Sequence, residues 1–219
     1  MRDFAAVTGM VLKTIPVGEY DRNVTILTKE RGKISAFARG ARRQTSRLCA
    51  AANPFSFGTF RLIEGKSAYN IAEADISKYF EGLRSDYESA CYGMYFLETA
   101  DYYTRENNDE KEMLRLLYQS IRALESGRFQ NSLVRYIFEI RAMVINGEFP
   151  GIPEKMTVDD STRYAVSFIA QTPVEKLYTF TVTQNVLEEL GRIGECGRRR
   201  VIDRDFKSLD VLDKLQLKN

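Results

Sequence analysis

The chain of 219 residues has no histidine, no tryptophan and only three cysteines: Cys49, Cys91 and Cys196. Without histidine, neither a Ser-His-Asp triad nor a Cys-His pair can form. The sequence also has no Walker loop and no closely spaced cysteine pair of the kind that holds zinc. These absences favour a protein that is not an enzyme and that needs neither a metal nor another cofactor.

Long apolar runs are absent too. No window approaches the roughly 20 apolar residues of a membrane-spanning helix, so we expect no membrane partner. The opening residues, MRDFAAVTGMVLKTIPVGEYDR, lack the apolar run of a secretory signal. An odd number of scattered cysteines is typical of a reducing compartment, and we therefore expect a cytoplasmic protein.

Charge is distributed unevenly along the chain. The 32 Lys and Arg residues nearly balance the 30 Asp and Glu residues, and the formal net charge is +2. Residues 1–47 contain ten basic and four acidic residues, so their net charge is +6 and that of the remainder is −4. The stretch ARGARRQTSR, residues 38–47, contains four arginines and no acid. Because such a cluster repels itself, it predicts an anionic partner.

The hydrophobic pattern changes its period near residue 80. Before it, short β-rich segments are separated by turn residues, including Gly65-Lys66, and predict a small barrel or sandwich with strands at 7–15, 23–29, 33–39, 57–64 and 67–77. After it, helical spacing predicts helices at 86–104, 108–127 and 131–147, with further candidates at 161–171 and 183–200. Three glycines weaken the last candidate, and residues 148–160 are expected to form a loop.

The predicted strand 33–39 has two different faces. Period two places Lys33, Ser35, Phe37 and Arg39 on one face and apolar residues on the other. Cations beside an aromatic ring suit single-stranded nucleic acid, which needs contacts for phosphates and a surface for base stacking. The following GARRQTSR should form a loop whose hydroxyl groups also reach phosphate oxygens. The alternative is a solvated strand face and loop, since charged outer faces of sheets are common.

A second basic run, Arg198, Arg199 and Arg200, lies near the end of the predicted helix 183–200. Cations there complement the helix dipole, and contact with nucleic acid or with an acidic peptide is the alternative. Acidic pairs within residues 203–213 could hold magnesium, although such pairs are frequent on helix surfaces. The sequence therefore leaves two other classes open, a metal-dependent nuclease and an interaction scaffold that never touches DNA.

The segment from GMVLKT (9–14) through GEYDR (18–22), TILTKERGK (25–33), ARGARRQTSR (38–47) and PF (54–55) resembles the N-terminal domain of the RecO family of bacterial recombination mediators. GRRRVIDRDFKSLDVLDKL, residues 197–215, resembles the C-terminal end of that family. The resemblance covers most of the chain. It is specific over residues 9–66 and weaker beyond them.

The resemblance implies an α+β multidomain fold, with a five-stranded OB-fold barrel at 1–80 that binds nucleic acid and an all-helical domain at 81–219. It implies a protein of the cytoplasm and nucleoid that binds single- and double-stranded DNA and anneals complementary strands. With RecR, and usually alongside RecF, such a protein helps to load RecA onto strands covered by single-strand-binding protein. It also binds the acidic C-terminal tail of that protein.

The residues and the resemblance together give one set of DNA-binding candidates: Lys13, Lys33, Phe37, Arg39, Arg42, Arg43, Arg47, Arg198, Arg199 and Arg200. No catalytic residue and no metal ligand is assigned. For the acidic tail, the helices at 108–147 could supply an apolar slot. Arg128, Arg135 and Arg141 are candidates there by charge alone.

One departure from the family pattern concerns zinc. Many RecO proteins carry a four-cysteine zinc site in the region that corresponds to residues 146–165. Here that region reads NGEFPGIPEKMTVDDSTRYA and contains no cysteine. We therefore expect the loop to be held by packing and by its prolines, or to be mobile.

Overall fold

A computed structural model describes residues 4–65 and 68–216. Lys66 of the expected turn and the first residue of the expected strand 67–77 lie outside the described residues. The chain divides into two compact units: a barrel unit, Met1–Glu81 with Leu97–Leu114, and a helical unit, Gly82–Phe96 with Arg115–Asn219. The expected domain boundary at residue 80 stays a prediction.

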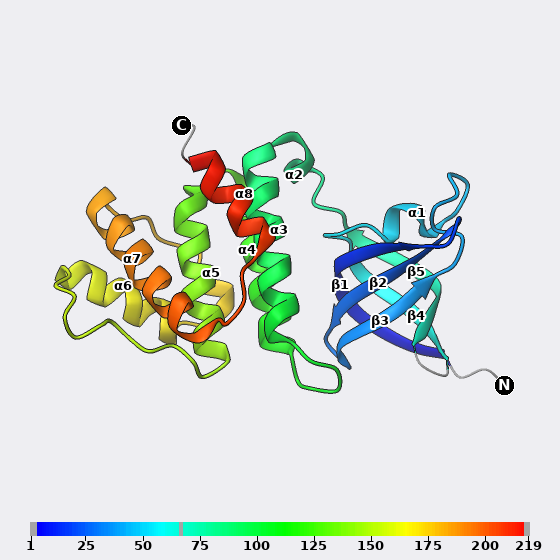
Figure 1. Cartoon of the computed structure of the whole chain (residues 1–219), viewed down its shortest axis with the longest axis horizontal. Coiled ribbons are helices and arrows are strands. Elements are labelled where there is room, and N and C mark those ends of the chain that lie inside the picture. Colours follow the sequence, from blue (N-terminus) through cyan, green and yellow to red (C-terminus); the bar gives the residue numbers. More distant parts are fainter. Residues whose placement is uncertain (1–3, 66–67, 217–219) are drawn as a thin grey trace. The chain divides into compact units, whose positions relative to one another are not determined.

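Five strands form a closed barrel with the order β1-β2-β3-β5-β4 (Figure 1). β3 and β5 are parallel and meet at Ala36–Tyr69 and Phe37–Asn70, whereas the other four pairings are antiparallel. This is the strand order of an OB-fold, which confirms the predicted fold class. The strands are β1 (Phe4–Val17), β2 (Asp21–Thr28), β3 (Gly32–Ala38), β4 (Phe57–Glu64) and β5 (Tyr69–Lys78).

Alternate residues of each strand fill the barrel. Ile26, Ile34 and Phe60 are among the fully buried side chains, as the period-two pattern predicts. A short helix, α1 (Leu48–Ala51), connects β3 to β4, and the sequence did not reveal it because four residues are too few to show a helical period. Ala41 and Ala52 are buried in the same core, one on each side of α1. The connection between the two strands is therefore anchored to the barrel.

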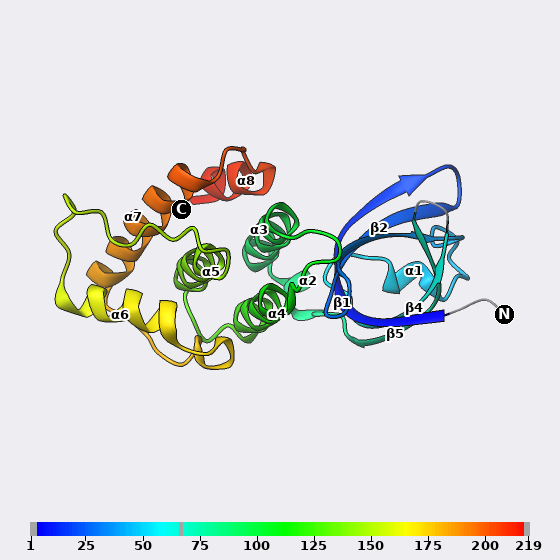
Figure 2. The ribbon, with the colours of Figure 1, turned by 90° about the horizontal axis from the view of Figure 1, so that it is seen from below.

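The second part of the chain is helical, and the five predicted helices are confirmed with small shifts at their ends. Asp86 caps α3, because its carboxylate accepts hydrogen bonds from the backbone N–H groups of Glu88 and Ser89. Figure 2 shows α5 nearly end-on with α6 and α7 beside it. The elements are α2 (Gly82–Ser85), α3 (Tyr87–Tyr103), α4 (Lys111–Ser126), α5 (Asn131–Ile145), α6 (Asp160–Gln171), the 3-10 turn η1 (Val174–Lys176), α7 (Gln184–Val201) and α8 (Lys207–Gln216).

The three glycines of α7 do not interrupt the helix. They recur every three residues and line its contact with α5. A Cβ atom at Gly191 would lie 2.8 Å from the Tyr136 ring, and one at Gly197 would lie 3.0 Å from Met143. The glycines that weakened the prediction of this helix thus serve its packing, because small residues let two helix backbones approach closely.

A charged network is buried in the helical unit, where α3 and α5 meet. Glu139 Oε1 accepts hydrogen bonds from Tyr95 at 2.6 Å and from Arg135 Nε at 2.9 Å. Burial raises the pKa of the Tyr95 hydroxyl well above its ordinary value, so this group stays protonated and donates. Arg141 is also buried and donates to the carbonyl oxygens of Ile169 and Ala170.

The segment around the expected loop 148–160 is packed against α7. Glu189 of α7 accepts hydrogen bonds from the backbone N–H of Asp159 at 3.0 Å and from the Thr162 hydroxyl at 2.5 Å. Val158 is buried, and the ring of Pro150 would lie 3.5 Å from a Cβ atom at Gly197. The structure therefore supports the first of the two expectations for this loop, namely that packing holds it.

We expect Glu139→Ala to lower the free energy of unfolding by about 3–5 kcal/mol, because it leaves the Arg135 guanidinium buried without its carboxylate. Urea denaturation measures this loss. The matched control is Glu195→Ala, which removes an ion pair with Arg199 whose side chains are 47% and 74% exposed. The control should cost less than about 1 kcal/mol. Equal losses in the two variants would contradict the assignment of a buried charge.

Candidate nucleic-acid interface

The outer face of β3 has the predicted composition. Ile34, Ala36 and Ala38 are buried, whereas Ser35 is exposed. The strand ends at Ala38, one residue earlier than predicted, and the exposed Arg39 follows it in a turn. Phe37 is half-buried between β2 and β5, opposite Asn23 of β2 and next to Asn70 of β5. The face therefore carries a half-buried aromatic ring between polar neighbours.

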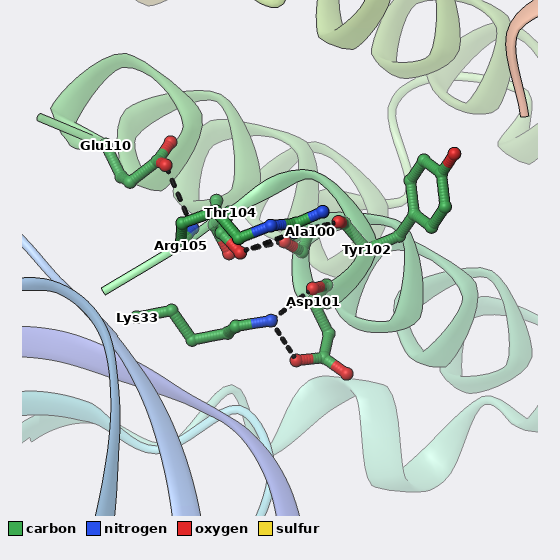
Figure 3. Close-up of polar contacts among 7 residues, drawn as sticks. All are labelled: Lys33, Ala100, Asp101, Tyr102, Thr104, Arg105 and Glu110. Carbon is green, nitrogen blue, oxygen red and sulfur yellow. Dashed lines mark hydrogen bonds and ion pairs between the residues drawn. The ribbon is translucent and has the colours of Figure 1, made fainter. Parts of the chain in front are cut away.

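Lys33 is already paired with a carboxylate within the barrel unit. Its Nζ donates to Asp101 Oδ1 at 2.9 Å and to the Asp101 carbonyl at 2.5 Å (Figure 3). The backbone N–H of Lys33 also donates to the carbonyl of Arg105, and the neighbouring Gly32 (φ +64°) leaves no room for a Cβ atom there. The β2–β3 hairpin is thus docked on the α3–α4 connection. Asp101 neutralises the charge of Lys33, which distinguishes it from the candidate arginines of residues 39–47.

The arginine stretch forms a series of tight turns rather than a loose loop. Backbone hydrogen bonds run from Ala41 to Ala38, from Arg43 to Gly40 and from Ser46 to Arg43. Ala41 is fully buried in the barrel core, whereas Arg42, Arg43 and Arg47 are exposed. The buried alanine fixes the position of a segment whose arginines face solvent.

The same turns are bound to the β1–β2 hairpin. The backbone N–H of Arg42 donates to the Tyr20 carbonyl at 2.9 Å, and Arg42 Nη1 donates to the Gly18 carbonyl at 2.7 Å. Gly40 N donates to Asp21 Oδ1 at 2.7 Å. The Arg43 guanidinium carbon lies 4.3 Å from the centre of the Tyr20 ring. The hairpin turn and the arginine turns therefore form one surface, which we call the hairpin–arginine surface (residues 18–21 and 39–47).

Tyr20 is not among the residues predicted from the sequence to bind DNA. An aromatic residue in the turn between the first two strands was the signal that could have found it, because that loop frequently contacts ligands in OB-folds. Tyr20 is 43% exposed. A hydrogen bond with Glu19 raises the pKa of its hydroxyl.

The arginines of the hairpin–arginine surface are not neutralised by carboxylates of the described residues. Within residues 4–65 and 68–216, no carboxylate lies within salt-bridge distance of Arg39, Arg42, Arg43 or Arg47. Arg39 Nε donates to the neutral amide oxygen of Asn70 at 3.1 Å. Lys13 is exposed on β1, opposite Thr25 of β2. A localised positive potential of this kind attracts a polyanion.

The second basic run belongs to the helical unit. Arg199 pairs with Glu195 at 2.5 Å, Arg200 is exposed and Arg198 is half-buried in the last turn of α7. Their position agrees with the dipole interpretation, since cations in the last turn face the free carbonyls. The structure does not join them to the hairpin–arginine surface in one compact unit.

A groove of about 750 Å³ lies in the helical unit between α6 and the segment Thr179–Val186. Its aromatic lining includes Tyr164, Phe168 and Phe180, and the last two rings are 5.1 Å apart. Asp160 is its charged lining residue. Arg135 and Arg141, which were candidates for binding an acidic tail, are instead buried in internal contacts, and only Arg128 of that group is exposed.

Two further observations concern metal binding and membrane-spanning helices. In the part of the chain that the structure describes, no three His, Cys, Asp or Glu side chains come together as metal ligands. Asp213 instead lies 4.0 Å from Arg135. None of the described helices combines the length and apolar character needed to cross a bilayer.

Comparison with known proteins gives the family. The family models for the N-terminal and C-terminal parts of recombination protein O match residues 1–80 and 84–152. The DNA repair protein RecO of Acetivibrio thermocellus is 27% identical over 97% of this chain and 98% of its own length. Those of Alkaliphilus metalliredigens and a Nocardioides species are 32% and 34% identical, over 65% and 64% of this chain and 58% and 59% of their own lengths. The closed barrel, the helices that follow it and these matches agree, and the chain belongs to the RecO family.

Proposed function

We propose that this chain is a mediator of DNA repair and recombination that binds single- and double-stranded DNA and anneals complementary strands. The relatives are named DNA repair proteins, which supports a role in repair. The observation that carries the proposal is the hairpin–arginine surface, whose exposed arginines have no carboxylate partner among the described residues. A surface of this kind favours binding of a polyanion over a purely structural role.

The mechanism of annealing follows from charge. Two DNA strands repel each other because each carries a dense row of phosphates. Arginines that contact phosphates release condensed counterions, and this release favours binding whatever the base sequence. With phosphates of both strands neutralised at one surface, the strands approach and their bases pair. No bond is made or broken, so the step needs no catalytic residue.

The anchoring of the arginines supports this role. Because Ala41 is buried and the backbone of Arg42 is bonded to Tyr20, the turns are ordered before any ligand arrives. A preordered site loses less conformational entropy when it binds. Exposed Gln44 and Thr45 add neutral donors for phosphate oxygens.

We assign nucleic-acid binding to the domain predicted at 1–80 and partner binding to the domain predicted at 81–219. The partners proposed are RecR and the acidic C-terminal tail of single-strand-binding protein, and the outcome is loading of RecA onto covered strands. These partners rest on the family resemblance. The cytoplasm and nucleoid are the matching location.

An annealing assay tests the function directly. The full chain, magnesium and two labelled complementary strands should give duplex faster than the strands alone, with no shortened product. Shortened strands would instead favour the metal-dependent nuclease. An unchanged annealing rate together with no binding to either strand would favour the DNA-independent scaffold.

The double variant Arg42→Ala/Arg43→Ala tests the arginine turns. DNA binding should weaken about equally for every sequence, because phosphates carry no base identity. The slope of log affinity against log salt should fall by about 0.9 for each lost contact on duplex DNA and about 0.7 on single strands. Fluorescence anisotropy over a salt series measures both quantities.

Two controls separate charge from folding in this test. Arg42→Lys/Arg43→Lys keeps the charge and should keep most of the slope. Arg61→Ala removes a half-exposed arginine of the same barrel that is already paired with Glu73 at 2.8 Å, and it should leave the slope unchanged. A folded double alanine variant with wild-type affinity and slope would mean that the arginine turns are only a solvated surface.

Substitution of Asp160 tests whether the acidic tail binds in the groove between α6 and Thr179–Val186. The Asp160 carboxylate repels an acidic peptide, whereas the apolar walls beside it suit apolar end residues. If the tail occupies this groove, Asp160→Asn should tighten binding of an acidic, apolar-ended peptide several-fold in calorimetry with the full chain. Asp109→Asn is the matched control, since Asp109 is exposed in the barrel unit. Equal affinity in both variants would place the tail elsewhere.

A further inference from the structure

Among the described residues of the barrel, three arginines lie over aromatic rings. In each, the guanidinium carbon is close enough to the ring centre for a cation–π interaction. The distances are 5.3 Å for Arg31 over Tyr69, 5.0 Å for Arg61 over Phe4 and 4.3 Å for Arg43 over Tyr20. All three pairs belong to the barrel unit, which allows them to be compared directly.

In two of these pairs a carboxylate neutralises the arginine, and in the third none of the described carboxylates does. Arg31 pairs with Glu64 and Arg61 pairs with Glu73, each at 2.8 Å. Arg43 has no carboxylate within salt-bridge distance among residues 4–65 and 68–216. An arginine that only supports an aromatic ring can do so while it is paired with a carboxylate, as Arg31 and Arg61 are. The third pair therefore keeps both a flat surface and an available cation.

The backbone of Tyr20 is bound to the arginine turns. Its carbonyl accepts the hydrogen bond from Arg42, and it lies in the turn that connects β1 to β2. Ile15 and Val17, at the end of β1, are 47% and 38% exposed. The hairpin end thus combines exposed apolar and aromatic side chains with the carboxylates of Glu19 and Asp21, next to arginines that form no ion pair among the described residues.

We propose that the Tyr20–Arg43 pair is a base-stacking site for single-stranded nucleic acid. The proposal rests on the proposed function, and it adds to that function a contact with bases. Nucleobases stack on aromatic rings and equally on the plane of an arginine guanidinium, and the pair offers both. Arg42 is adjacent in sequence and supplies the phosphate contact beside the stacked base.

This site distinguishes single strands from duplexes. Bases in a duplex are stacked on each other and are not available to Tyr20, whereas the phosphates of both forms are available to the arginines. A stacked base also faces away from its own strand, where it can meet a complementary base. The hairpin end would therefore hold a single strand in a state that favours pairing.

Substitution of Tyr20 in the full chain tests the site. Tyr20→Leu should weaken binding to an oligothymidine by about 5- to 150-fold, the range that corresponds to loss of one stacked base. Duplex affinity should stay within about twofold, and the salt slope should not change, because no charge is removed. Tyr20→Phe keeps the ring and should bind as the wild type does.

The matched control for this substitution is Phe4→Leu. Phe4 is 52% exposed on the same barrel and lies under an arginine that Glu73 neutralises, so its loss should leave oligothymidine binding unchanged. A loss in Tyr20→Leu that is equal on single strands and duplex, with a shallower slope, would show that the ring only positions Arg43. That result would overturn the stacking site.

A second measurement does not depend on loss of affinity. Because the chain contains no tryptophan, Tyr20→Trp introduces a single fluorescent indole. Oligothymidine should quench this fluorescence, and an abasic strand of equal length should not, while Phe4→Trp should respond to neither. Binding without quenching in Tyr20→Trp would overturn the stacking site and leave the annealing function standing. A wild-type chain that binds no oligonucleotide would overturn both.

Discussion

The burial of Ala41 in the barrel core is the constraint on which the candidate interface depends. Four arginines within nine residues repel one another, and a free chain would spread them apart. The buried alanine and the hydrogen bonds from Gly40 and Arg42 to the β1–β2 hairpin keep them together. Folding of the barrel thus supplies the free energy that holds an unneutralised cluster in place.

Most of the fold could be predicted because its signals are local. Alternation over β2 and β3, and helical spacing over α4 and α5, appear within a few residues of each other along the chain. The sequence did not reveal α1 and α2, which at four residues are too short to show a helical period, and α8 (Lys207–Gln216) was also not predicted although it has ten residues. The glycines of α7 were misjudged for a different reason. Sequence reveals that they lack side chains, but not that Tyr136 of another helix fills the space.

The candidate interface was predictable in composition but not in its contacts. The sequence predicts Lys33 and Arg39 on the same strand face, whereas in the structure β3 ends at Ala38 and Arg39 lies in the turn that follows. Nothing in the sequence joins Lys33 to Asp101, which is 68 residues away, although this contact neutralises one cation and not the other. The pairing of Tyr20 with Arg43 was hidden in the same way, since two turns meet only when the barrel closes.

A nearly neutral protein can carry a surface of positive potential that suits nucleic acid. The potential of a surface depends on which of its charges are paired with opposite charges, and less on the net charge of the chain. In the helical unit, Arg135 is buried against Glu139 and Arg199 is paired with Glu195, so these cations act within the fold. On the barrel, Arg31 and Arg61 are neutralised in the same manner. The arginines of residues 39–47 have no carboxylate partner among the described residues, and they are concentrated on one ordered segment. Long-range attraction of a phosphate chain depends on such a local excess, and the net charge of +2 does not reveal it.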